Sequence, residues 1–146
     1  PVSGVDDKEE IRALIRGWSR ALEARDPDAL VARYAPDILM FFPNPPYRVS
    51  GIEATRRLWK SALTAFPELF KSERRDLRIE VSGDLAFAHS LHHIEPIGED
   101  HPFGQTWVRA TVCFRKTDGQ WRAAHEHVSV PFDPTSGKAV FIEQVY

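Results

Sequence analysis

The residues best suited to chemistry lie together near the end of the chain, in the run His125-Glu126-His127. In a strand, neighbouring side chains point to opposite faces, so Glu126 lies on one face and both histidines on the other. A carboxyl group that is desolvated among apolar side chains has a raised pKa and can act as a general acid or base. Histidines at alternate positions of a strand are roughly 6.6 Å apart and can chelate one metal ion. The face that looks into a pocket therefore decides which chemistry is open to the chain.

This run belongs to a predicted β-hairpin over residues 105–132, which turns at Thr117-Asp118-Gly119. Two β-rich runs around a short connection that contains a glycine are typical of a hairpin. If Lys116 opposes Gln120, then Glu126 opposes Ala110 and shares an apolar face with Val108, Ala110, Val112, Ala124 and Val128. The other face is polar and carries Trp107, Arg109, Thr111, His125, His127 and Ser129. A register shift of one residue would exchange the two faces.

The polar face is not expected to bind a metal ion. In this register Thr111 opposes His125 and Arg109 opposes His127, so the obvious neighbours supply no third ligand. The positive charge of Arg109 also disfavours a bound cation at that position. We therefore predict no metal site and no cofactor.

The elements that position these residues can be read from hydrophobic spacing and from turn residues. Helices are predicted over residues 6–25, 27–35 and 50–66, and strands over 38–42, 47–49, 73–82, 85–96, 105–116 and 120–132. This order indicates an α+β domain, with three N-terminal helices packed on one side of a curved antiparallel or mixed sheet. On the strand 85–96, Phe87, His89, Leu91 and His93 share one side, while Ala88, Ser90 and His92 share the other. The charged run 73–78 is expected at a solvated strand edge.

The composition limits the possible partners. The 146 residues, 42% hydrophobic and 27% charged, are ordinary for one globular domain, which we expect to span residues 1–146. A net charge of −2 gives no reason to expect nucleic acid or a membrane surface as a partner. The single cysteine, Cys113, excludes an internal disulfide, and no membrane span or signal peptide is recognised. A cytoplasmic location is the expectation.

Several segments resemble the NTF2-like superfamily, and within it SnoaL-like proteins and ketosteroid isomerase homologues. They are Ala24-Arg-Asp-Pro-Asp-Ala-Leu30, Tyr34-Ala-Pro-Asp37, Val49-Ser-Gly51 and Gly83-Asp-Leu-Ala-Phe-Ala88. The hairpin from Thr117 to Ser129 also resembles the end of the association domain of calcium/calmodulin-dependent kinase. The resemblance covers nearly the whole chain and implies a cone-shaped fold with a pocket between helices and sheet. It implies no single chemistry, because the superfamily includes isomerases, cyclases, dehydratases and binding modules.

The resemblance also implies which positions line the pocket: Trp18, Tyr34, Phe42, Phe87, His89, Leu91, Ala110, Val112, Glu126 and Val128. Ketosteroid isomerase uses an aspartate base and an oxyanion hole made of a tyrosine and a protonated aspartate. Matched by position, the base falls on Phe42, the tyrosine on Trp18 and the second aspartate on Val112. Phenylalanine cannot take a proton and valine cannot donate a hydrogen bond, so steroid isomerisation by that route is not expected.

From these residues we predict proton transfer on a small apolar molecule, as in a cofactor-independent isomerase, cyclase or dehydratase. Glu126 is the predicted acid or base, His89 its partner, and Trp18 and Tyr34 hydrogen-bond donors. The predicted ligand-binding residues are Phe42, Trp59, Phe87, Leu91, His93, Ala110, Val112 and Val128. Two alternatives stay open: Glu126 pairs with a buried histidine as a structural contact, or the chain is a non-catalytic binding or oligomerisation module.

A sheet face without helix cover that carries an aromatic and several polar groups suggests a subunit interface. The polar hairpin face, with Trp107, Arg109, Thr111, His125, His127 and Ser129, has this character. The resemblance also implies association through this face, and we expect a homodimer.

Overall fold

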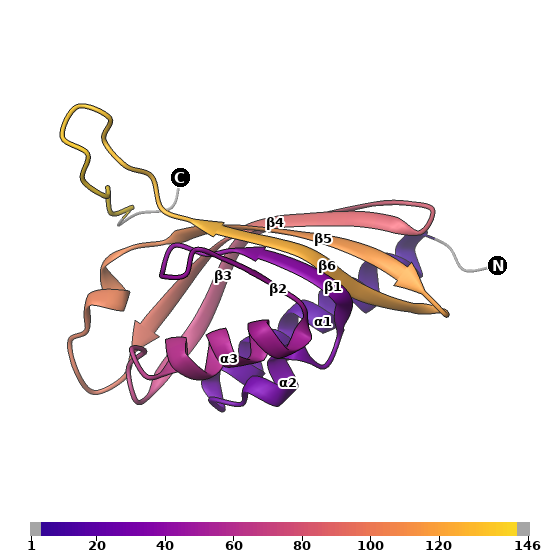
Figure 1. The fold of residues 1–146 in the computed structure, drawn as a ribbon, viewed down its shortest axis with the longest axis horizontal. Coiled ribbons are helices and arrows are strands. Elements are labelled where there is room, and N and C mark those ends of the chain that lie inside the picture. Colours follow the sequence, from indigo (N-terminus) through magenta and orange to yellow (C-terminus); the bar gives the residue numbers. More distant parts are fainter. Residues whose placement is uncertain (1–3, 143–146) are drawn as a thin grey trace.

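Three helices and a six-stranded sheet form two layers in the computed structural model, which describes residues 4–142 (Figure 1). The elements are α1 (Gly4–Glu23), α2 (Pro27–Val31), β1 (Tyr34–Phe41), β2 (Arg48–Ser50), α3 (Ile52–Leu63), β3 (Phe70–Ser82), β4 (Leu85–Pro96), the 3₁₀ helix η1 (Pro102–Gln105), β5 (Val108–Thr117) and β6 (Gln120–Ser129). The predicted α+β architecture is confirmed. No helix among the described residues is long and apolar enough to cross a membrane.

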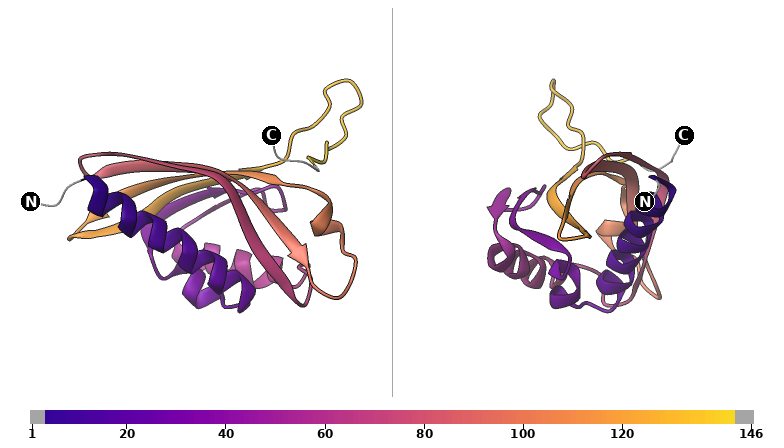
Figure 2. Two further views of the ribbon diagram at one scale, coloured as in Figure 1. Left: turned by 180° about the vertical axis from the view of Figure 1, so that it is seen from behind. Right: turned by 90° about the vertical axis from the view of Figure 1, so that its right-hand side faces the viewer.

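The sheet is mixed, with the strand order β2-β1-β6-β5-β4-β3. The predicted meander of β3 to β6 is antiparallel throughout, whereas β1 runs parallel to β6. All three helices lie on the same side of the sheet (Figure 2), with α1 packed against β3 and α3 against β1 and β2. We call this side the helix-facing side and the opposite side the outer face. Tyr34, predicted at the end of the second helix, instead begins β1 and is buried.

The β5–β6 hairpin has a different register from the predicted one. Its turn is the two-residue loop Asp118-Gly119, so that Thr117 pairs with Gln120. A β-bulge follows, because Phe114 pairs with Ala123 while the adjacent Cys113 pairs with His125. The predicted pairing of Glu126 with Ala110 is wrong, since Glu126 opposes Val112. Its predicted side is correct: Glu126 is buried on the helix-facing side, and the exposed His127 lies on the outer face.

The prediction for β4 is wrong. Ala86, Ala88 and Ser90 are buried on the helix-facing side, while Phe87 and His89 are exposed on the outer face. Ala86 pairs with Phe114 and Ala88 with Val112, so small residues on β4 make room for larger ones beside them. The indole of Trp18 fills the same region and stacks on Phe114, with ring centroids 5.8 Å apart. Space in the core, rather than the hydrophobicity of the strand, therefore selects its buried side.

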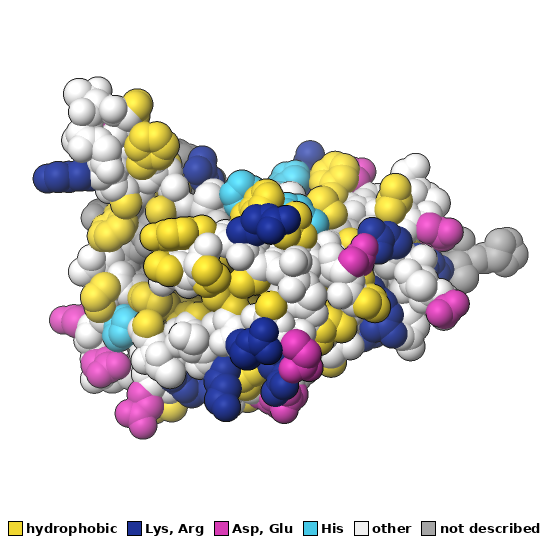
Figure 3. All heavy atoms as spheres, in the orientation of Figure 1, with side chains coloured by type: hydrophobic (Ala, Val, Ile, Leu, Met, Phe, Trp, Pro, Cys, Tyr) yellow, Lys and Arg dark blue, Asp and Glu magenta, His cyan; other side chains and the backbone are white. Residues whose placement is uncertain are grey.

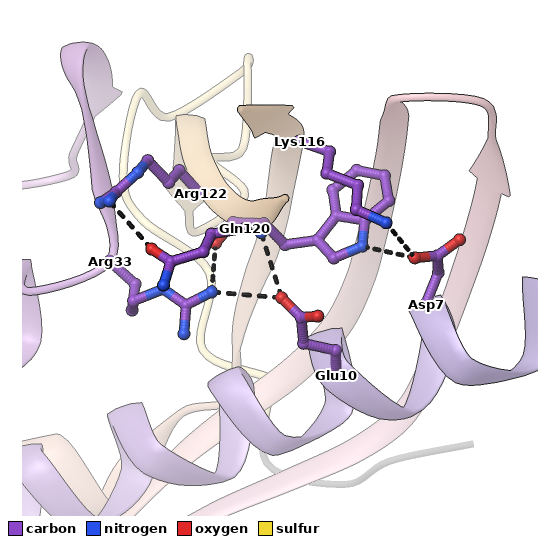
Figure 4. A network of polar contacts seen from close by, with 7 residues as sticks. Asp7, Glu10, Arg33, Lys116, Gln120 and Arg122 are labelled. Atoms are coloured by element: carbon purple, nitrogen blue, oxygen red, sulfur yellow. Dashed lines mark hydrogen bonds and ion pairs between the residues drawn. The ribbon is translucent and has the colours of Figure 1, made fainter. Parts of the chain in front are cut away.

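A polar network fixes α1 to the turn end of the hairpin (Figure 4). Asp7 Oδ1 accepts hydrogen bonds from Trp121 Nε1 at 2.9 Å and from Lys116 Nζ at 3.1 Å. One turn later, Glu10 Oε2 accepts from the backbone N–H of Trp121 at 3.1 Å and from Arg33 at 3.2 Å. Trp121 is fully buried, so these contacts satisfy its polar atoms in the core.

Candidate functional site

A cavity of about 330 Å³ lies between the helices and the helix-facing side of the sheet. Figure 3 shows hydrophobic side chains gathered around a hollow between η1 and α3. Most lining residues are apolar. They come from α1, α2, α3, η1, β1, β3, β4, β5 and β6 and from the loops beside them. Seven of the residues expected at a pocket line it: Trp18, Tyr34, Phe42, Trp59, Ala110, Glu126 and Val128.

The other expected pocket residues do not line the cavity. Phe87, His89 and Leu91 lie on the outer face because β4 presents its alternate side to the helices. His93 is also on the outer face, where it is buried against Trp107. Val112 is on the helix-facing side, but it packs in the core rather than in the cavity wall. The predicted pair of Glu126 with His89 is therefore wrong, since the sheet lies between the two side chains.

Glu126 is the acidic group of the cavity. It is 8% exposed, and burial raises the pKa of its carboxyl from 4.5 to about 7, although the nearby charge of Arg74 acts in the opposite direction. Within residues 4–142, the carboxyl forms no hydrogen bond or ion pair and is directed to the cavity. A group with this pKa is present in both protonation states near neutral pH, which is the condition for general acid–base catalysis.

Tyr34 and Trp59 form a hydrogen-bonded pair in the cavity wall. Trp59 Nε1 donates to the Tyr34 hydroxyl oxygen at 2.9 Å, which joins α3 to β1. Burial, followed by the negative charge of Glu126, raises the pKa of Tyr34 well above its ordinary value. The phenol therefore stays protonated, and its O–H is left to donate to a molecule in the cavity.

Arg74 and His92 are ionisable cavity residues that the sequence reasoning missed. They are directly opposite each other on β3 and β4, and both line the cavity. Burial lowers the pKa of His92 well below its ordinary value, and the charge of Arg74 acts in the same direction, so the imidazole is neutral. Its Nε2 lies 2.7 Å from the hydroxyl of Ser72. Arg74 reaches Ser90 Oγ at 3.3 Å, while its Nε is buried and has no hydrogen-bond partner among the described residues.

The position of these two residues could be predicted only by knowing which side of β4 faces the helices. The run of charges predicts a solvated strand edge for Arg74, yet its cross-strand partner is His92. Choosing the side of β4 with Ala88, Ser90 and His92 would have placed His92 at the cavity. The irregularity between Arg75 and Arg78 then decides that Arg74, rather than Arg75, is its partner.

The cavity thus combines a carboxyl that titrates near neutral pH, a protonated phenol and a guanidinium within apolar walls. A carboxylate can take a proton from carbon, and a phenol and a guanidinium can stabilise the negative charge that develops on an adjacent oxygen. This set of groups suits proton transfer next to a carbonyl group.

Comparison with known proteins identifies related folds across nearly the whole chain. The SnoaL-like domain family matches residues 11–133. An NTF2-like protein of unknown function from Pseudomonas putida KT2440 is 35% identical, with 97% of each chain covered and a TM-score of 0.85. No curated protein matches the chain.

More distant structures share the fold alone. A candidate dehydratase of the NTF2-like family from Streptomyces avermitilis is 21% identical, with a TM-score of 0.73 over 87% of this chain and 97% of that one. A candidate calcium/calmodulin-dependent protein kinase type II association domain from Thiobacillus denitrificans is 22% identical, with a TM-score of 0.69 over 81% of this chain and 92% of that one. The resemblance to NTF2-like proteins and to the association domain of calcium/calmodulin-dependent kinase, noted in the sequence, is confirmed at the level of the fold.

Proposed function

The chain belongs to the SnoaL-like domain family, and we propose that it transfers protons on a small apolar molecule that carries a carbonyl oxygen. The observation that supports this most strongly is the buried, unpaired carboxyl of Glu126 facing the cavity with a pKa of about 7. Isomerases, cyclases and dehydratases that work without a cofactor need such a group. The shared fold of the candidate dehydratase from Streptomyces avermitilis supports this proposal.

In the proposed reaction, the Glu126 carboxylate takes a proton from the carbon next to the carbonyl group. The electron pair of that C–H bond moves to the carbonyl oxygen, which becomes negative. The Tyr34 O–H donates a hydrogen bond to this oxygen, and the Arg74 guanidinium supplies a positive charge in the same desolvated space. The protonated Glu126 then returns its proton, either to another carbon, which gives an isomer, or to a departing hydroxyl group, which leaves as water.

The proposed roles differ from those expected from the sequence. His89 cannot assist Glu126 because it is exposed on the outer face. Arg74 and Tyr34 take the charge-stabilising role, and Trp59 holds the Tyr34 hydroxyl in place. Trp18 packs edge-on against Tyr34 with ring centroids 6.1 Å apart, which fixes the phenol from the other side.

Replacing Glu126 by Gln tests the proposal, because the amide keeps the shape of the carboxyl and cannot accept the proton. A panel of small cyclic ketones, enones and β-hydroxy ketones would be incubated with the protein in D₂O and followed by NMR for deuterium incorporation or loss of water. We expect Glu126→Gln to slow a protein-dependent reaction by about 10²- to 10⁴-fold. Binding, read from the fluorescence of the cavity residues Trp18 and Trp59, should be retained.

His89→Gln is the matched control, since this residue lies outside the cavity and its replacement should change neither rate nor binding. Exchange that continues unchanged in Glu126→Gln would contradict the proposal.

A second candidate function is a non-catalytic binding module. The mainly apolar lining of the cavity favours it, since such a surface can hold an apolar ligand with no chemistry at all. The same panel separates the two functions. Compounds that quench the tryptophan fluorescence but exchange no hydrogen in the wild-type protein would support the binding module.

A further inference from the structure

A second cluster of polar side chains lies on the outer face of the sheet, across the sheet from the cavity. Glu73 on β3 is directly opposite His93 on β4, and Glu95 follows His93 by two residues on the same face. One ligand atom from each of the three side chains can be chosen so that all lie within 4.8 Å of one another. None of these residues takes part in the proposed proton transfer.

His93 is buried and aimed between the two carboxylates. It is 8% exposed, and its Nε2 lies 3.0 Å from the carbonyl oxygen of Gly104. A carbonyl oxygen only accepts hydrogen bonds, so Nε2 carries the hydrogen and Nδ1 is directed the other way. Nδ1 lies 3.6 Å from Glu73 Oε1 and 3.6 Å from Glu95 Oε2. It is shielded from solvent and has no hydrogen-bond partner among the described residues.

The surroundings hold this imidazole in one orientation. The indole of Trp107 stacks on it, with ring centroids 4.8 Å apart and an angle of 22° between the planes. Gly104 approaches so closely that a Cβ at this position would lie 2.8 Å from Pro96 Cδ, so only glycine brings its carbonyl oxygen to His93 without a shift. A histidine that binds a metal ion through one ring nitrogen commonly donates the N–H of the other nitrogen to a backbone carbonyl, which fixes the ring. His93 has this arrangement.

The distances match those between ligands of a small divalent cation. Two ligands about 2.1 Å from a tetrahedral ion are about 3.4 Å apart, close to both separations at Nδ1. Two carboxylates also provide the negative charge that a divalent ion needs. Their side chains are 26% and 53% exposed for Glu73 and Glu95, which gives an ion and its water a path from solvent. Two cations lie on this face beside the cluster: Arg75 lies over the Trp107 ring, and Lys71 is directly opposite Glu95. Among the described residues, neither forms an ion pair with Glu73 or Glu95.

We propose that Glu73, His93 and Glu95 bind one divalent transition-metal ion. Zn²⁺ is the best match, since one imidazole and two carboxylates are ligands that it accepts, with water completing a tetrahedral site. The ion would join β3 to β4 beside Arg74 and His92, whose side chains point to the cavity on the other face. Because the ligands meet only in the folded chain, the ion stabilises the fold.

The alternative occupant of Nδ1 is a second proton, which would make His93 a cation paired with both carboxylates. The two states are distinguished by titrating the tag-free protein, freed of metal by a chelator, with Zn²⁺ in a calorimeter and by long-range ¹H–¹⁵N NMR of the histidine rings. We expect one ion per chain, and a change in the Nδ1 signal of His93 while its Nε2–H is retained. Glu95→Gln, a change at a half-exposed residue that leaves the fold intact, should weaken binding at least tenfold, and His93→Gln should do the same.

His127→Gln is the control, because His125 and His127 on the outer face also have the spacing of a chelating pair. Its Zn²⁺ affinity should equal that of the wild-type protein. The proposal is overturned if no saturable binding is seen, if Nδ1 of His93 stays protonated throughout, or if His127→Gln rather than Glu95→Gln removes the binding.

Discussion

Glu126 is a carboxyl group at a position where an apolar side chain would pack without a desolvation penalty. It opposes Val112 on β5, and Ala110 and Val128 lie nearby in the cavity wall. Burying a carboxylate that has neither a hydrogen bond nor an ion pair is strongly unfavourable, and the group responds by holding its proton. A residue placed in a cavity against this destabilisation is a candidate for function.

Glu126→Gln should therefore change how stability depends on pH. The folded-state pKa of about 7 lies above the ordinary value of 4.5, so the folded chain binds this proton more tightly than the unfolded chain. The proton on Glu126 therefore adds about 3 kcal/mol to the free energy of unfolding. This contribution is complete below pH 4.5 and is lost as the pH rises through 7. Urea denaturation gives the free energy of unfolding of both proteins between about pH 4 and about pH 8. Over this range the wild-type value should fall by this amount relative to that of the variant. A difference that does not depend on pH would mean that the carboxyl is solvated.

At the scale of elements, the β5–β6 hairpin shows why the side of Glu126 was predictable and its partner was not. The turn is one residue shorter than expected, which moves the register by one position, and the bulge at Ala124 moves it by one more. Beyond the bulge, the two shifts together return each β6 side chain to its predicted side of the sheet. Its partner on β5 is displaced by two residues from the predicted one. Between the turn and the bulge, the β6 side chains lie on the side opposite to the predicted one. Trp121 and Ala123 are therefore the buried residues of this part of β6, in place of Ala124.

The β4 strand could not be assigned by hydrophobicity. The side with Phe87 and Leu91 carries larger apolar side chains, yet the side with Ala86, Ala88 and Ser90 is buried. Large side chains on other elements, Trp18 and Phe114 above all, already occupy the volume over β4. Such complementarity depends on contacts between distant segments, which spacing along one strand does not reveal. The error at β4 is also the reason that His92 was missed, and the irregularity in β3 between Arg75 and Arg78 is a further reason for Arg74.

The contact of α1 with the hairpin gives a prediction at this scale. The hydrogen bond from Trp121, followed by that from Lys116, lowers the pKa of Asp7 from its ordinary value of 3.8. The ionised Asp7 carboxylate therefore stabilises the folded chain above pH 3.8, and this effect is lost as the pH falls through the lower pKa of the folded state. Asp7→Asn should lower the Tm at pH 7, and the difference should shrink below pH 3.8. Glu9→Gln is the control, because Glu9 pairs only with the exposed Arg12 of the same helix. Equal Tm values for wild type and Asp7→Asn at pH 7 would show that this network does not stabilise the fold.

At the scale of the whole molecule, the outer face is the surface that no helix covers. Two rows cross it on neighbouring strands: Phe87, Cys113 and His125, and beside them His89, Thr111, His127 and Phe41. Phe87 is 45% exposed and Phe41 36%, and the Phe41 ring packs edge-on against both His125 and His127. Trp107 lies on the expected side of the sheet, but it is buried against His93 and is not exposed for a partner. We propose that a second copy of the chain covers this face, which presents both aromatic and polar groups to a partner.

The proposed dimer predicts a mass of twice 16.6 kDa in sedimentation velocity. Phe87→Glu places a charge on the proposed interface and should shift the protein to the monomer. Leu69→Glu is the matched control, because Leu69 is also an exposed apolar residue but lies just before β3, outside the two rows. A monomeric wild-type protein, or equal dissociation by both variants, would argue against this interface.

The claim on which the proposed function depends is that the cavity holds a desolvated carboxyl that titrates near neutral pH. The most direct test follows the side-chain ¹³C carboxyl signal of Glu126 by NMR as a function of pH, in the wild-type protein and in Arg74→Met. We expect a midpoint near 7 in the wild type, and a higher one in the variant because the charge of Arg74 lowers this pKa. A wild-type midpoint near the ordinary 4.5, unchanged by the loss of Arg74, would place the carboxyl in water and contradict the proposed proton transfer.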